Sequence, residues 1–386
     1  MSGCLDGVKV LELARYQAGP RAGLLMSDMG AEVVKVEKPG GEETRAHAPL
    51  VNGTSVYFTV YNRGKKSITL NMRSAEGKEI FRELVKTADV VLENFRPGVI
   101  AKMGFGYDEL KKIKPDIILT SVSGFGQYGP YRDRPAFDPI GQAMSGLMEI
   151  TGIHEGHPVL TGSPIIDRIT SLHACIGTLG AIIHRNATGE GQVIDVSLLD
   201  TGVTLTEIPI SHHLGTGAGT EDYYGSVYKA KDGYVTIPAT SRTLWTRVFI
   251  AMGRHELAEN PDILGFEADD GSKAKRLALL EEWVAENSVA DVTERLVAAE
   301  VPVGPVQTPA QMARDPHLHQ RKMMVEVPTE DGQGKIMAPG LSIKFSKTKG
   351  AVGKVPAAGE HTGEILARLP GMTPDKIEDL RSRGVV

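Results

Sequence analysis

An aspartate stands at the start of a long apolar segment in the middle of the chain. The segment GSPIIDRITSLHACIGTLGAIIHR, residues 162–185, is almost entirely apolar or small after its first turn, which predicts a buried helix that Asp167 opens. One interpretation is structural, because a carboxylate at a helix N-terminus meets the helix dipole favourably, by typically ~0.3–1 kcal/mol. The other is functional: the same dipole would keep a partly buried carboxylate ionised, as a nucleophile requires. The local pattern leaves both interpretations open.

Other motifs point less clearly to chemistry. GFGQYG, residues 124–129, has dinucleotide-binding spacing after a predicted strand, but Pro130 follows it where such a site needs a helix. The adjacent His212 and His213 belong to no metal-ligand pattern, and no metal site is predicted. Cys175, on the apolar helix, is interpreted as a core residue rather than a nucleophile.

Composition narrows the class of protein. The chain of 386 residues is long enough for two or three domains, with 41 % hydrophobic and 24 % charged residues. Its net charge of −5 gives no electrostatic reason to expect nucleic acid or an acidic membrane as a partner. Two cysteines cannot build a disulfide framework, and we expect neither a signal peptide nor a membrane span. A cytoplasmic enzyme is the expectation.

The first two hundred residues alternate between β-branched runs and helical stretches, which predicts a parallel sheet covered by helices on both faces. The predicted strands are 8–13, 32–37, 67–72, 90–95, 117–123 and 193–200. The predicted helices are 20–29, 74–87, 107–113, 138–150 and 162–185. The fold class is therefore α/β, with a Rossmann-like large domain.

The pattern changes after residue 200. We expect a large domain over 1–200, a linker with a glycine-rich loop over 201–225, and a small α+β domain over 226–325. The small domain begins with a predicted hairpin, 226–239, that turns at KDG, and continues with helices at 243–253, 273–287 and 289–299. A return linker and C-terminal helices, 326–386, are expected to pack on the large domain.

Ordered blocks along nearly the whole chain resemble the class III CoA-transferases, the family of formyl-CoA transferase and carnitine CoA-transferase. The blocks that carry the resemblance are GVKVLELARYQAGPRAGLLMSDMGAEVVKVEKPGGEETR (7–45), NRGKKSITLNMRSAEGKE (62–79), ADVVLENFRPGVIAKMGFGYDEL (88–110), SVSGFGQYGPYRDRPAFDPIGQAMSG (121–146), TGEGQVIDVSLLD (188–200) and GEHTGEIL (359–366). So many blocks in family order make the resemblance specific.

The resemblance implies covalent acyl transfer with Asp167 as the nucleophile. In such enzymes this aspartate attacks the thioester of an acyl-CoA to give an aspartyl anhydride, and an aspartyl-CoA thioester follows. Two easy steps then replace one hard step, provided that water is kept from both intermediates. Coenzyme A enters as part of the substrates, a small carboxylic acid is the second substrate, and no tightly bound cofactor is implied.

The resemblance also implies roles for other residues. Gln17 is the expected contact to the acyl group, where an amide suits a developing oxyanion. Asp138 is expected to steady the catalytic region, although a helix N-cap is an equally good interpretation of it. Gly217 and Gly219 take the place of a loop that covers the aspartate, or else belong to a simple linker. The expected CoA-binding residues are Arg15, Ala18, Lys38, Leu70, Asn94, Phe95 and Lys102, the last of which is equally well explained as a solvated helix residue.

Two alternatives belong to other functional classes. Racemases of the same fold pair the aspartate with a histidine, because moving a proton at one carbon needs an acid–base pair. Here the matching position is Phe137, in AFD, which cannot carry a proton and so favours transfer. A non-catalytic acyl-CoA-binding protein would have lost the nucleophile, whereas Asp167 is present. The resemblance further implies a homodimer of two interlocked, ring-like chains.

Overall fold

The computed structural model describes residues 3–219, 227–265 and 271–386, which form two compact units. The larger unit combines both ends of the chain, Met1–Thr220 and His317–Val386, and the smaller unit is Glu221–Pro316. Asp167 and the residues that line its cavity all lie in the larger unit.

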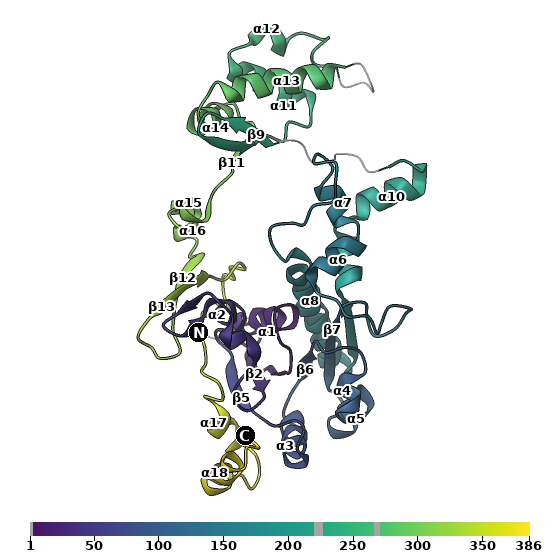
Figure 1. Ribbon diagram of the computed structural model, residues 1–386, viewed down its shortest axis with the longest axis vertical. Helices are drawn as coiled ribbons and strands as arrows, with labels where there is room; N and C mark the ends of the chain where they lie inside the picture. Colours follow the sequence, from purple (N-terminus) through teal and green to yellow (C-terminus); the bar gives the residue numbers. More distant parts are fainter. Residues whose placement is uncertain (1–2, 220–226, 266–270) are drawn as a thin grey trace. The chain divides into compact units, whose positions relative to one another are not determined.

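Six parallel strands form the central sheet of the larger unit, in the order β5-β2-β1-β6-β7-β8 (Figure 1). Their bounds are Lys9–Glu12 for β1, Glu32–Glu37 for β2, Lys66–Thr69 for β5, Val90–Glu93 for β6, Ile118–Ser123 for β7 and Val193–Ser197 for β8. Each predicted strand overlaps one of these, and the predicted parallel sheet is confirmed. The errors lie at the ends, above all where 193–200 runs into a helix.

The sheet is buried because helices cover both faces, so that neighbouring residues of one strand enter different cores. Val10, Val33 and Val90 pack in one core with α1 (Ala18–Asp28) and α8 (Ile165–Thr188). Their neighbours Leu11, Val34 and Val91 pack in the other core. The helices of that second core are α3 (Ala75–Val85), α5 (Tyr107–Ile113), α17 (Thr362–Leu366) and α18 (Pro374–Ser382).

The strand order has one reversal, between β1 and β6. The chain runs outward from β1 through β2 to β5, and then returns to β6 and runs the other way through β7 to β8. Two loops therefore separate at this point, the one after Glu12 and the one after Glu93. In open α/β sheets, ligands bind at such a reversal, outside the carboxyl ends of the strands, because the diverging loops leave a crevice there.

Helix α8 is long and apolar enough to cross a membrane by length and composition, which the sequence analysis did not expect. A core helix of a soluble protein passes the same test, and α8 packs on α1, β7 and β8. Cys175, in its middle, is buried. One such helix is therefore weak evidence for a membrane.

The C-terminal segment packs on the first strands of the chain. Helix α17 contacts β5, and the backbone N–H of Asn71 donates to the backbone carbonyl of Val385 over 2.7 Å. In Figure 1 these late elements, drawn in yellow, lie beside the purple strands of the same unit.

The remaining elements of the larger unit are η1 (Glu43–Ala46), β3 (Leu50–Val51), β4 (Thr54–Ser55), α2 (Val56–Asn62), α4 (Val99–Lys102), α6 (Asp138–Met144), α7 (Leu147–Thr151), α9 (Leu198–Thr204), α10 (Glu207–Thr216), β12 (Met324–Pro328) and β13 (Lys335–Pro339).

The smaller unit contains a three-stranded antiparallel sheet and its own core. Strands β9 and β10 form the hairpin that the sequence predicts, with Lys231 and Asp232 as its turn. The elements of the smaller unit are β9 (Val227–Ala230), β10 (Gly233–Thr236), β11 (Gly304–Pro305), α11 (Arg242–Met252), α12 (His255–Ala258), α13 (Ser272–Ala285), α14 (Val289–Ala298) and α15 (Pro309–Met312). Helix α16 (Pro316–Gln320) lies almost entirely in the larger unit.

The segment 201–225, expected as a linker and loop, contains regular structure. Helices α9 and α10 occupy most of it up to Thr216, because the run before the glycines is apolar enough to continue as helix. Residues 220–225 lie outside the described part of the chain.

Candidate active site

A cavity of about 370 Å³ lies where the sheet reverses its order. Arg15 and Gln17, from the loop after β1, and Ala18, the first residue of α1, line it, as do Asn94 and Phe95 from the loop after β6. Asp167, on the first turn of α8, lines the same cavity. The fold therefore brings together six of the expected site residues, which come from three separate segments of the chain, 7–45, 88–110 and 162–185.

Asp167 is held by Asp138, which belongs to another helix. The backbone N–H of Asp167 donates to Oδ2 of Asp138 over 3.1 Å, and the side chain of Gln142 donates to Oδ1. Asp138 is thus not the N-cap of its own helix, a place that Phe137 takes without a side-chain hydrogen bond. Instead its buried carboxylate accepts one of the free N–H groups at the start of α8.

Burial raises the pKa of Asp167 to about 7, and the like charge of Asp138 adds to the effect. The functional interpretation expected the helix dipole to keep this carboxylate ionised, whereas burial raises its pKa. A carboxylate with such a pKa is a better nucleophile than an ordinary one, yet is still largely ionised slightly above neutral pH. A raised pKa together with a place in the cavity wall is consistent with the chemical interpretation of Asp167.

Gln17 contributes a free hydrogen-bond donor. Its side chain is 4 % exposed, and Nε2 is buried without a hydrogen-bond partner among the described residues. Buried amides are normally satisfied, so an orphan donor beside a cavity calls for an acceptor on a ligand. The preceding residue, Tyr16, has φ of +67°, a left-handed conformation that favours glycine and that often marks a functional loop.

Aromatic rings extend from one wall of the cavity, where Tyr16 and Phe137 line it and His47 and Tyr57 adjoin them. Tyr16 and Tyr57 are not among the site residues expected from the sequence. The Tyr16 ring lies 6.2 Å from the rings of both Phe137 and His47, and the His47 ring lies 5.3 Å from that of Tyr57. Burial raises the pKa of the Tyr57 hydroxyl well above the ordinary value for tyrosine, so this hydroxyl stays protonated. Tyr57 lies in none of the blocks that carry the family resemblance, so only the fold could have revealed it, whereas Tyr16 lies next to Gln17 within the block 7–45.

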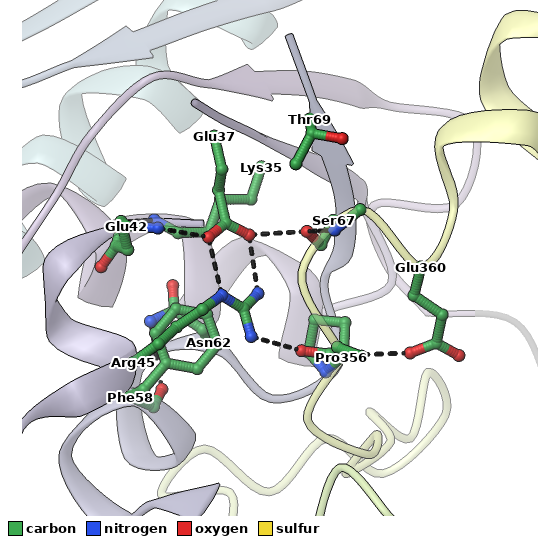
Figure 2. Close-up of polar contacts among 12 residues, drawn as sticks. Lys35, Glu37, Glu42, Arg45, Phe58, Asn62, Ser67, Thr69, Pro356 and Glu360 are labelled. Carbon is green, nitrogen blue, oxygen red and sulfur yellow. Dashed lines mark hydrogen bonds and ion pairs between the residues drawn. The ribbon is translucent and has the colours of Figure 1, made fainter. Parts of the chain in front are cut away.

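Arg45 does not reach this cavity as a free cation. Its guanidinium makes two 2.7 Å hydrogen bonds to Glu37 and donates to the carbonyl of Pro356 over 2.9 Å (Figure 2). It also stacks 3.9 Å over the ring of Phe58. Arg45 therefore joins the C-terminal segment to β2, and is not available to a substrate carboxylate.

A second cavity, of about 740 Å³, adjoins the first through the shared walls Arg15 and Phe95. Lys38 and Leu70 line it, as does Gly384 from the C-terminal segment. Lys38 is exposed, and its Nζ lies 2.9 Å from Glu43. Cationic and apolar groups along one groove suit a long ligand that carries phosphates.

Four of the expected residues line neither cavity, and one of them, Asp138, still contacts Asp167. Lys102 is exposed on α4, although its neighbours Val99 and Met103 line the second cavity. Gly217 ends α10 with φ of +72°, and Gly219 follows it; neither lines a cavity with Asp167. Asn94 lines the first cavity, but its side-chain amide is engaged with both backbone groups of Arg15, at 2.8 and 2.7 Å.

The chain matches the family description "CoA-transferase family III" over residues 5–362. The chain belongs to CoA-transferase family III. It is 35 % identical to the succinyl-CoA–L-malate CoA-transferase beta subunit of Chloroflexus aurantiacus, over 99 % of this chain and 98 % of that one. It is 33 % identical to the formyl-CoA:oxalate CoA-transferase of Streptomyces avermitilis, over the full length of both.

A solved structure has the same fold. The crystal structure of a CaiB/BaiF family protein from Brucella suis superposes with a TM-score of 0.84 at 34 % identity, covering 95 % of this chain and all of that one. The resemblance read from the sequence is thus confirmed, and the chain is an enzyme of the CoA-transferase type. Enzymes of this type use CoA thioesters as substrates.

Proposed function

We propose that the enzyme moves CoA from an acyl-CoA to a free carboxylic acid through covalent intermediates on Asp167. The observation that carries the proposal is the position of Asp167, a carboxylate with a raised pKa that lines a cavity beside the orphan donor of Gln17. Gln17 Nε2 serves the oxyanion that develops on the thioester carbonyl.

The reaction balances in four displacements. A carboxylate oxygen of Asp167 attacks the thioester carbonyl, the C–S bond breaks, and CoA thiolate leaves a mixed anhydride. The thiolate attacks the aspartyl carbonyl, which gives aspartyl-CoA and releases the first acid as its carboxylate. The second acid attacks aspartyl-CoA to form a new anhydride, and the thiolate then attacks its acyl carbonyl. The products are the new acyl-CoA and free Asp167.

The larger cavity holds the CoA portion in this proposal. Lys38 and Arg15 face the phosphates, and Leu70 and Phe95 contact the adenine or the pantetheine arm. The relatives act on succinyl-CoA and on formyl-CoA with oxalate, as their names state. Short dicarboxylic acids are therefore the first acids to test, with succinyl-CoA as the first donor.

Racemisation is the second candidate, and the structure gives no observation in its favour. Phe137 occupies the place of the required second base, and no histidine lines the cavity with Asp167 among the residues that the structure describes. A non-catalytic acyl-CoA-binding protein is the third candidate. The half-buried Asp167 carboxylate, with its raised pKa, argues against it.

The decisive experiment is isotope exchange. The enzyme is incubated with succinyl-CoA and ¹³C-labelled succinate or another acid, and the acyl-CoA products are analysed by mass spectrometry. Transfer predicts label in the acyl-CoA pool, with loss of exchange in Asp167→Asn. Stereochemical scrambling of a 2-methylacyl-CoA without exchange would support racemisation, and binding with neither reaction would support a binding protein.

We also propose that the enzyme works in the cytoplasm as an interlocked homodimer. In the single chain α8 exposes a row of apolar side chains, with Ile176 65 % and Ile183 70 % exposed, and such a surface is normally covered. Both cysteines are free, as expected in a reducing compartment. Solution mass should show a dimer that does not dissociate on dilution, because threaded chains cannot separate without unfolding.

A further inference from the structure

A buried ionic cluster lies directly under the loop that carries Gln17. Glu12, at the end of β1, and Lys35, on β2, are both fully buried, and Lys65, just before β5, is 3 % exposed. Lys65 Nζ lies 2.8 Å from the Glu12 carboxylate, and Lys35 Nζ lies 3.3 Å from it. Three charged side chains thus meet in the core, close to the site.

The two lysines also bind the backbone on either side of that loop. Lys35 Nζ donates to the carbonyl of Ala14 over 2.8 Å, and Lys65 Nζ donates to the carbonyl of Pro20 over 2.7 Å. Between those carbonyls lie Arg15, the left-handed Tyr16 and Gln17. The lysines therefore fix both ends of the segment that faces Asp167.

Each ammonium has further partners that keep it in place. Lys35 Nζ lies 2.7 Å from the Glu42 carboxylate, and Lys65 Nζ donates to Oδ1 of Asn62 over 3.0 Å. Lys35, Glu42 and Asn62 appear together around Arg45 in Figure 2. Helix α1 rests on the cluster, since a Cβ added at Gly23 would lie 1.8 Å from Oε2 of Glu12.

Stability alone does not account for such a cluster. Burial lowers the pKa of Lys65 to about 8, which reflects the cost of holding this charge in the core. Packed apolar side chains commonly stabilise a core as well as buried ion pairs do. What apolar side chains cannot supply is a pair of donors for the carbonyls of Ala14 and Pro20, and this need points to a geometric role.

We propose that Lys35 and Lys65 are positioning residues for the transfer reaction: joined through Glu12, they hold the 14–20 segment so that Gln17 Nε2 meets the reacting carbonyl above Asp167. The inference rests on the proposed function. It concerns the chemical steps rather than CoA binding, because neither lysine lines the cavity assigned to CoA.

The test compares Lys65→Met with Lys66→Met in the exchange of labelled succinate with succinyl-CoA. Lys66 is the next residue, but it binds Glu32 and Glu364 on the outside of the sheet, so it controls for the loss of a paired lysine. We expect kcat of Lys65→Met, per folded protein, to fall about 100-fold, with KM for succinyl-CoA changed less than threefold, because a misplaced catalytic group costs about that much. Lys66→Met should keep both constants.

Two further variants separate positioning from folding. Glu12→Gln combined with Lys65→Met removes both charges; it should recover thermal stability and leave kcat low, since the tie from the Lys65 ammonium to the Pro20 carbonyl is still missing. Asn62→Ala removes one partner of Lys65 and no charge, so it should fold and lose kcat about three- to tenfold. Recovery of kcat together with stability, a rise in KM at constant kcat, or normal kcat in Asn62→Ala would overturn the inference. Absence of exchange by the wild-type enzyme would instead refute the proposed function.

Discussion

Replacing Asp167 by asparagine should stabilise the enzyme, and by more as the pH rises. The side chain is half-buried in the cavity wall, and its pKa is raised from 3.8 to about 7. The folded state therefore keeps a proton that the unfolded state loses between these values, so stability falls as pH rises through this window. Asparagine has nearly the same shape but never carries the charge.

The size of the effect follows from the two pKa values. A difference of one pKa unit corresponds to ~1.4 kcal/mol, so the full shift makes the ionised side chain cost roughly 4 kcal/mol. Part of this cost already exists at pH 5, where the unfolded state is ionised. From pH 5 to pH 8 the stabilisation by Asp167→Asn should grow by about 2–3 kcal/mol, which is roughly 4–6 °C in Tm for a unit of this size.

The assay is thermal unfolding of both proteins at pH 5, 6, 7 and 8, followed by circular dichroism. Asp133→Asn, on the exposed loop before α6, is the matched control and should show no such trend. A Tm difference between Asp167→Asn and wild type that stays constant across this pH range would refute the reasoning, because the carboxylate would then carry no desolvation penalty.

Two other predictions address the site, and a third addresses the Arg45–Glu37 ion pair outside it. Asp138→Asn removes the like charge beside Asp167, so the acid limb of the kcat profile should move to lower pH, as measured by steady-state kinetics in overlapping buffers. Gln17→Leu should lower kcat by about 10²–10³-fold in the exchange assay, the usual loss for one oxyanion donor. Arg45→Met leaves the buried Glu37 without its ion-pair partner, so the free energy of unfolding, measured with denaturant, should fall by about 3–5 kcal/mol. Arg45→Lys should retain part of this stability, because it keeps the charge.

The parallel sheet was predictable because its strands are short, β-branched and separated by helical patterns. Asp167 was detectable for a related reason, since it stands on the first turn of a long and otherwise apolar helix. The resemblance of the surrounding blocks then chose between its two interpretations. The ends of the elements were less certain, because capping and tertiary packing set them, as with the helix that begins within the predicted strand 193–200.

Contacts between distant segments were not predictable. Nothing in the sequence says that Arg45 binds Glu37 and Pro356 rather than a substrate, or that Asn94 binds the backbone of Arg15. The role of Asp138 as a cap for a different helix likewise depends on how α6 and α8 meet. Tyr57 was missed because its place near Asp167 exists only in three dimensions.

The most direct measurement of the central claim is covalent trapping at Asp167. The wild-type enzyme is incubated with ¹⁴C-succinyl-CoA, quenched with hydroxylamine, digested and sequenced by mass spectrometry. The proposed chemistry predicts a hydroxamate on Asp167, formed only when succinyl-CoA is present, and none in Asp167→Asn. An enzyme that exchanges CoA at its normal rate while this residue stays unmodified, or after its replacement, would contradict the account.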